Sequence, residues 1–85
     1  MRVRAGQGLL WVTAGEPETR GLEVGVYDLV GRRVLKVQAQ GSRLVAFLRD
    51  ERGRPLANGV YLVEVKLRRA DGTVVRELRK IVLMR

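Results

Sequence analysis

Hydrophobic and polar residues alternate along much of the chain with a period of two, which is typical of β-strands that bury one face. Three segments show the alternation most clearly: Leu22 to Tyr27, Arg33 to Ala39 and Val60 to Leu67. In each of them every second residue is apolar, whereas charged residues and glycine fall mostly between. We expect these strands and the last one to share one core made of Val24, Val26, Tyr61, Val63, Val65, Ile81 and Leu83.

Three further segments are apolar but less regular. Gly8 to Ala14 fits a strand, and Ser42 to Arg49 fits a strand covered on both faces or one that crosses between sheets, because its apolar run shows no face preference. Val74 to Met84 changes parity part-way, which predicts a β-bulge near Glu77–Arg79. No segment shows a helical period.

Turn signals separate these segments. The pattern D-x-x-G-R occurs twice, from Asp28 to Arg32 and from Asp50 to Arg54. Aspartate suits the first turn position because its carboxylate accepts a backbone N–H two residues on, and glycine supplies a positive φ. Asn-Gly and Asp-Gly pairs add two more turns. The residues predicted to build turns are Asp28, Gly31, Asp50, Gly53, Asn58, Gly59, Asp71 and Gly72.

The spacing of these turns, about 8–12 residues, predicts an all-β domain of six or seven strands, either an antiparallel sandwich or a small barrel. The 85 residues are enough for one domain, residues 1–85, with one modest core.

Composition argues against most catalytic chemistry. The chain has no cysteine and no histidine, so it lacks disulfides, thiolate metal sites, the commonest general base and the commonest metal ligand. Ser42 is the only serine. We therefore expect neither enzyme activity nor a cofactor, with no catalytic, cofactor-binding or metal-binding residues.

The few aromatic residues decide whether the chain could stack bases. Single-stranded nucleic acid is bound by aromatic side chains that alternate with arginine on an exposed face. We assign Trp11, Phe47 and Tyr61 to the core and only Tyr27 to an outer face, so the pattern does not favour such a platform.

The chain is strongly basic, with a net charge of +8. From Lys66 to Arg85 seven basic residues face two acidic ones. Such a field attracts nucleic acid, anionic lipid or acidic polysaccharide, although it also fits a soluble arginine-rich surface. If nucleic acid is the partner, the expected phosphate contacts come from Arg68, Arg69, Arg76, Arg79 and Lys80.

Targeting signals are weak in this chain. The apolar run Leu9 to Val12 is shorter than the roughly 7–15 residues of a signal-peptide core. Nothing approaches the ~20 apolar residues of a membrane-spanning helix. The chain therefore either stays inside the cell, in the cytoplasm, or is one piece of a longer exported protein.

Three stretches together resemble a known family: "LEVGVYDLVGRRV", "RDERGRPLANGVYLVEV" and "LRKIVLMR". They are similar to the immunoglobulin-like C-terminal domains of exported bacterial proteins, which include the type IX secretion C-terminal sorting domain and the Ig-like domain of the flagellar hook-capping protein. The resemblance covers residues 22–85. It departs from the family at Phe47, where a tryptophan is common, and in "GEPETRG", which lacks a P-N-P-like opening.

The resemblance implies a small antiparallel Ig-like β-sandwich without catalytic or metal-binding residues. It also implies that the last strand is the element read during secretion, with the recognition residues Arg79, Lys80, Ile81, Val82, Leu83 and Arg85. A plain core strand would have much the same sequence.

These observations predict a non-enzymatic sorting or surface-attachment module of a larger exported protein, at the cell surface or outside the cell. Its partners would be the secretion or surface-assembly machinery, with acidic polysaccharide as a further candidate. Two alternatives remain open: a small basic nucleic-acid-binding β-barrel, and a structural subunit that assembles with its own copies through edge strands.

Overall fold

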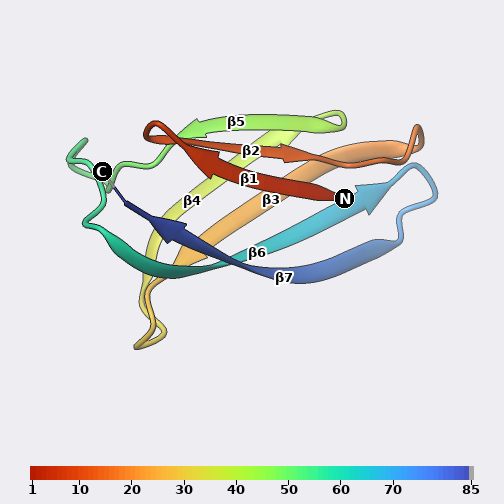
Figure 1. The fold of residues 1–85 in the computed structure, drawn as a ribbon. Coiled ribbons are helices and arrows are strands. Elements are labelled where there is room, and N and C mark those ends of the chain that lie inside the picture. The colour runs from red at the N-terminus through yellow and green to blue at the C-terminus, as the bar shows by residue number, and fades with distance from the viewer. Residues whose placement is uncertain (85) are drawn as a thin grey trace.

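The computed structural model describes residues 1–84, and every regular element in them is a β-strand. Figure 1 shows the strands in two layers. In chain order they are β1 (Arg2–Gly6), β2 (Leu9–Thr13), β3 (Thr19–Tyr27), β4 (Arg33–Gln40), β5 (Arg43–Phe47), β6 (Gly59–Arg69) and β7 (Val74–Leu83).

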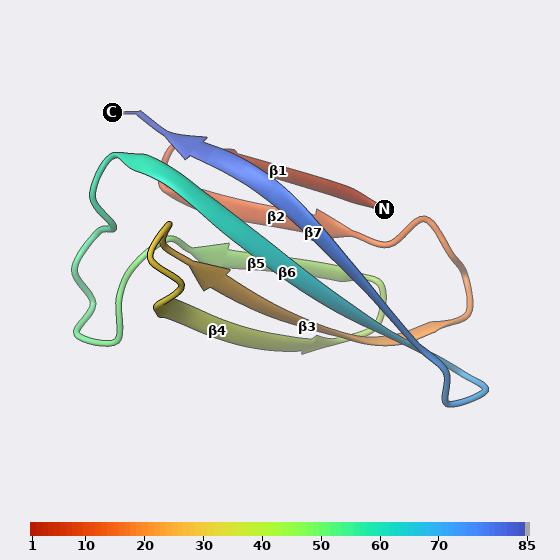
Figure 2. The ribbon, with the colours of Figure 1, turned by 90° about the horizontal axis from the view of Figure 1, so that it is seen from below.

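The strands form two separate antiparallel sheets. One sheet has the order β1-β2-β5 and the other has the order β4-β3-β6-β7. The protein is therefore an all-β sandwich and not a closed barrel. Seen from below in Figure 2, β1 and β7, which are edge strands of different sheets, lie on the same side of the sandwich.

The core lies between the inner faces of the two sheets. Its largest fully buried side chains come from β2, β3 and β6 and are Leu10, Val12, Val24, Val26, Val63 and Val65. All seven residues expected in the core are buried, Tyr61, Ile81 and Leu83 among them. Removing such side chains from water contributes about 1.5–3 kcal/mol each, so this row of valines and leucines holds the sheets together.

The alternating pattern missed β1. Gly6 pairs with Leu9 across a two-residue turn in which Gln7 and Gly8 have φ of 53° and 77°. Positive φ at both central residues is the signature of a type I′ turn, whose twist matches that of the flanking strands. The segment Arg2–Gly6 is short, and β1 is recognisable from this turn together with the alternation of Arg2 and Arg4 with Val3 and Ala5.

The bulge predicted near Glu77–Arg79 was wrong. The register of β7 with β6 is continuous from Gly59 opposite Leu83 to Arg68 opposite Val74. The odd-numbered positions of β7 lie on the inner side throughout, and Leu78, on the outer side, is 55% exposed. An edge strand tolerates this arrangement because its middle is close to solvent.

The strand β5 is not covered on both faces. Leu44 is buried, whereas Val45 and Phe47 are 60% and 66% exposed on the outer face. Trp11, on the neighbouring strand β2, is only half-buried on that same face. The assignment of Trp11 and Phe47 to the core was therefore wrong, and only Tyr61 of the three aromatic residues lies there.

Candidate functional site

The two D-x-x-G-R turns have the same structure. In the first, Asp28 Oδ1 accepts hydrogen bonds from the backbone N–H groups of Val30 (3.1 Å) and Arg32 (2.9 Å), and Asp28 Oδ2 accepts one from Arg32 Nε at 3.1 Å. Gly31, whose φ is 88°, completes the turn by donating its N–H to the Asp28 carbonyl. The aspartate, the glycine and the arginine of the pattern thus each have a structural role.

The second turn repeats each of these contacts. Asp50 Oδ1 accepts from the N–H groups of Arg52 and Arg54, both at 2.9 Å, and Oδ2 accepts from Arg54 Nε at 3.1 Å. Gly53 has a φ of 79°. These contacts account for the repeat of D-x-x-G-R without a ligand.

The carboxylates of the turns have lowered pKa values. The backbone N–H of Arg32 holds the pKa of Asp28 below its usual value of 3.8, and the backbone N–H of Arg54 does the same for Asp50. At the β6–β7 turn the N–H of Thr73 lowers the pKa of Asp71. A carboxylate that accepts such bonds is stabilised in its charged form, so these groups suit turn formation rather than acid–base catalysis.

The proposed recognition residues of the last strand divide between two faces. Ile81 and Leu83 are buried in the core, whereas Lys80 and Val82 lie on the outer face of the four-stranded sheet. Arg79 points to the inner side, where its guanidinium binds Glu77 Oε2 at 2.8 Å. Of the described recognition residues only Lys80 and Val82 lie on the outer face, and Arg85 lies outside the described residues.

The edge of β7 distinguishes it from β3 and β6. β7 pairs with β6 on one side, and within residues 1–84 no strand is hydrogen-bonded to its other side. Its backbone N–H and C=O groups along that side are the kind that a further strand can join.

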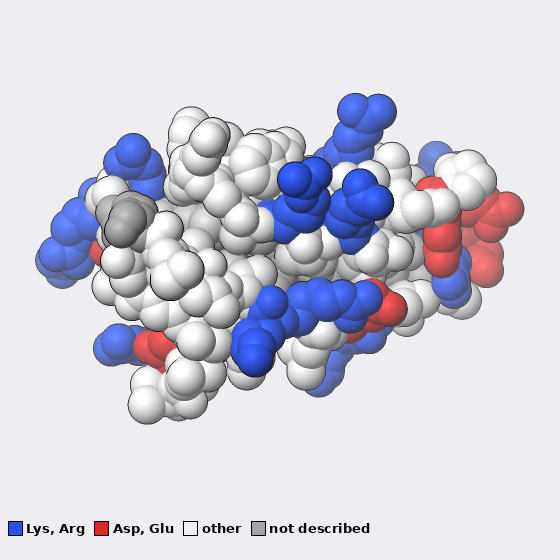
Figure 3. Space-filling view, in the orientation of Figure 1, with Lys and Arg blue, Asp and Glu red and all other residues white. Residues whose placement is uncertain are grey.

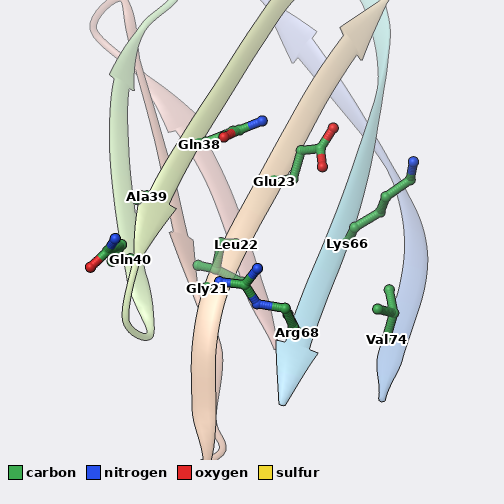
Figure 4. Close-up of a pocket in the computed structure, with 9 residues that line it drawn as sticks. All are labelled: Gly21, Leu22, Glu23, Gln38, Ala39, Gln40, Lys66, Arg68 and Val74. Atoms are coloured by element: carbon green, nitrogen blue, oxygen red, sulfur yellow. The ribbon is translucent and has the colours of Figure 1, made fainter. Parts of the chain in front are cut away.

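An open hollow of about 500 Å³ lies on the outer face of the four-stranded sheet (Figure 4). Arg68 lies across Gly21, with one guanidinium nitrogen 3.3 Å from the position that a Cβ would take. Glu23, from the adjacent strand, is paired with Lys36 at 3.3 Å. Within residues 1–84, the hollow included, no three carboxylates lie closely enough together to hold a metal ion.

Internal ion pairs engage three of the seven basic residues between Lys66 and Arg85. Arg69 binds Glu16 through two bonds of 2.8 and 2.9 Å, Arg76 binds Glu64 at 3.0 Å, and Arg79 binds Glu77. The bond from Arg69 also lowers the pKa of Glu16. Three of the five expected phosphate contacts are thus occupied by carboxylates.

The arginines of the three-stranded sheet are different. Arg2, Arg4 and Arg43 form no ion pair with any residue that the structure describes. Figure 3 shows basic side chains across the middle of the surface along which β1 and β7 run. Acidic side chains gather instead at the end that carries the β2–β3 loop and the β6–β7 turn.

Sequence reasoning missed the basic character of the three-stranded sheet, because its arginines come from two distant segments of the chain. A signal was nevertheless present, since residues 1–14 and 41–49 contain four arginines and no aspartate or glutamate. In addition, Arg2 and Arg4 alternate with Val3 and Ala5, which is the pattern of a strand with one basic face.

Comparisons with protein-family models, with curated proteins and with solved structures gave no match to this chain. Across residues 1–84, no helix has the length and apolar character that crossing a membrane requires.

Proposed function

We propose that this chain is a non-enzymatic sorting or surface-attachment module of a larger exported protein, and that a partner reads it through β7. The observation that carries the proposal is the position of β7. It is a ten-residue strand at the edge of the four-stranded sheet, with buried Ile81 and Leu83 on one face and exposed Lys80 and Val82 on the other.

The arrangement of strands supports the immunoglobulin-like part of the proposal. β3, β6 and β7 lie side by side as strands C, F and G do in immunoglobulin-type sandwiches, and β1, β2 and β5 lie as strands A, B and E do. Tyr61 adds a second feature of that class. It lies near the start of β6, and its hydroxyl donates to the carbonyl of Ala57 at 2.6 Å, as in a tyrosine corner.

Partner recognition would proceed by addition of a strand to the free edge of β7. Backbone hydrogen bonds supply affinity in such complexes, and side chains at alternate positions supply specificity. Lys80 and Val82 are the alternate outward positions near the end of β7, and Lys80 has no ion pair within residues 1–84. Ile81 and Leu83 anchor the strand in the core, which keeps the edge ordered before the partner arrives.

The middle of β7 limits this recognition to the end of the strand. Glu77 and Arg79 occupy inward positions there, opposite Val65 and Val63. Inward charges on edge strands discourage indiscriminate pairing, because a second sheet would bury them. The ion pair between Glu77 and Arg79 thus discourages strand pairing at the middle of β7. The segment from Lys80 to Leu83 remains for a specific partner to pair with.

The test uses residues 1–85 fused behind a reporter that has its own signal peptide, in a bacterium with a type IX secretion system. We expect the unmodified fusion at the cell surface or in the medium. We expect Lys80→Glu and Val82→Glu to leave the reporter in the periplasm. Circular dichroism of each purified domain establishes that both variants are folded.

Val74→Glu is the matched control. Val74 is also on the outer face of β7, at 59% exposure, but at the opposite end of the strand. Export of Val74→Glu together with retention of the other two variants supports the proposal. Equal export of all three variants, or periplasmic retention of the unmodified fusion, contradicts it, and self-association through β7 would favour a structural subunit instead.

A further inference from the structure

The outer face of the three-stranded sheet combines exposed apolar and aromatic side chains with arginine. We call it the arginine–aromatic face and define it by Arg2, Arg4, Leu9, Trp11, Arg43, Val45, Phe47 and Arg49. The exposed fraction is 66% for Phe47 and 60% for Val45. Exposed apolar side chains that cluster on one face are more typical of interaction sites than those that are scattered singly.

The strand register sets the spacing of the aromatic rings. Trp11 lies opposite Val45, so Phe47, two residues further along β5, is its diagonal neighbour. Diagonal neighbours on one face are about 7–8 Å apart. The Trp11 ring lies toward Gly6 of β1, with its Cζ3 3.9 Å from the position that a Cβ of Gly6 would take. The two aromatic residues are thus near neighbours on one face, and their backbone positions are spaced as neighbouring bases of an extended strand would need.

Arginines flank both rings. Arg4 lies opposite Trp11 on β1, and the guanidinium of Arg49 lies 5.8 Å from the centroid of the Phe47 ring. Arg2 and Arg43 are both opposite Thr13, at the other end of the face. None of these four arginines forms an ion pair within the described part of the chain.

The charge of this face selects the kind of partner. The two segments that build the sheet, residues 1–14 and 41–49, carry four arginines and no carboxylate. A second copy of the face would therefore bring like charges together, which disfavours a dimer through this surface. A polyanion with flat apolar groups meets both requirements, because its charges neutralise the arginines and its planar groups cover the rings.

We propose that the arginine–aromatic face binds single-stranded nucleic acid. Bases stack on Trp11 and Phe47, and phosphates bind the four arginines, which is the combination that sequence-tolerant single-strand binders use. An apolar hollow of about 690 Å³ opens beside Phe47, between Arg49 and the end of β7, and offers space for a further base. This inference uses the opposite sheet from the proposed export function and does not depend on it.

Trp11 provides the assay, because it is the only tryptophan of the chain. An oligothymidylate of about a dozen nucleotides is long enough to cover one such platform. We expect it to quench the fluorescence of Trp11 on titration, and the same oligonucleotide in duplex form to bind more weakly because its bases are not free to stack. Since each phosphate contact on a single strand contributes about −0.7, we expect a slope of log affinity against log salt of up to roughly −3.

Two variants separate stacking from charge. Phe47→Ala should weaken binding about five- to a hundredfold, the usual effect of removing one stacking ring. Arg4→Gln should reduce the salt slope by about 0.7. The matched controls are Leu78→Ala, an exposed apolar residue on the outer face of the other sheet, and Arg76→Gln, whose guanidinium is paired with Glu64. Both controls should bind like the unmodified protein.

Four results would overturn the proposal. The first is the absence of Trp11 quenching by the oligothymidylate. The second is an equal loss of affinity in Phe47→Ala and Leu78→Ala, which would indicate attraction without stacking. The third is tighter binding of an acidic polysaccharide, polygalacturonate, with the same quenching. The fourth is a concentration-dependent dimer that buries Trp11. Either of the last two would assign the face to another partner.

Discussion

At the scale of single residues, the D-x-x-G-R turns show how a repeated pattern arises without a ligand. One aspartate satisfies two backbone N–H groups and one guanidinium, and one glycine adopts a conformation that other residues avoid. The chemistry of the turn is complete within five residues, so the same pattern can occur in any loop that must reverse direction tightly.

Replacing the turn glycines with valine should destabilise the domain. Gly31 and Gly53 have φ of 88° and 79°, and no atom lies within 4 Å of a Cβ built on either. The cost is therefore one of backbone conformation rather than of collision, and we expect more than about 1 kcal/mol for each valine. Urea unfolding measures it, with Gly31→Asn as the control that tolerates positive φ. If both valine variants unfold at the same urea concentration as the unmodified protein, the account of the turns is wrong.

Acid should destabilise the protein through the same turns. The pKa values of Asp28, Asp50 and Asp71 are lower in the folded chain than the ordinary value of 3.8. The folded state then binds fewer protons, so this stabilisation is present above pH 3.8 and is lost as the pH falls through the folded pKa values. Unfolding midpoints measured from pH 6 down to pH 2 test this, and Asp28→Asn should show a shallower loss. If the unfolding midpoint falls equally steeply with pH in the variant and in the unmodified protein, the mechanism is wrong.

At the scale of elements, β7 combines an anchored end, a protected middle and an open edge. Glu77 and Arg79 neutralise each other at inward positions, with 2.8 Å between Arg79 Nη2 and Glu77 Oε2. The two inward charges lose only part of their hydration, because both side chains are partly exposed at the rim of the sandwich.

Removing both inward charges should make the protein self-associate through the edge of β7. In Glu77→Val/Arg79→Val the inward row of β7 becomes apolar from Val75 to Leu83. We expect the double variant to keep its strand content but to self-associate, because the feature that discourages edge pairing is gone. Sedimentation velocity at several concentrations measures this. Replacing the outer-face pair Glu64 and Arg76 with valine is the control. A Glu77→Val/Arg79→Val variant that stays as monomeric as the unmodified protein would refute the protective role.

Sequence alone could predict the elements that obey a simple alternation. β3, β4 and β6 are recognisable because each has one apolar face, and the core residues follow from it. β5 was misinterpreted because Val45 and Phe47 are apolar on a face that the sandwich leaves open. For the same reason the sequence did not predict the arginine–aromatic face. Only the register of β1, β2 and β5 shows that Trp11 and Phe47 share a face with Arg4.

At the scale of the whole molecule, stability depends on the row of valines between the sheets. Val63→Ala should cost about 1–3 kcal/mol because Val63 is fully buried and its loss leaves a cavity. Val45→Ala, at 60% exposure, should change the free energy of unfolding by about 0.5 kcal/mol or less. Urea unfolding of the two variants makes the comparison. Equal losses would mean that Val45 is covered or that Val63 is not in the core.

The central claim is that β7 is an ordered strand with one open edge, on which the proposed export function depends. Amide hydrogen exchange followed by NMR tests it most directly. We expect protection at every second amide of β7, namely those that donate to β6, fast exchange at the others, and protection on both sides along β6. Uniform protection along β7 would mean that its edge is already covered, and uniformly fast exchange would mean that the strand is not docked; either result would contradict the account.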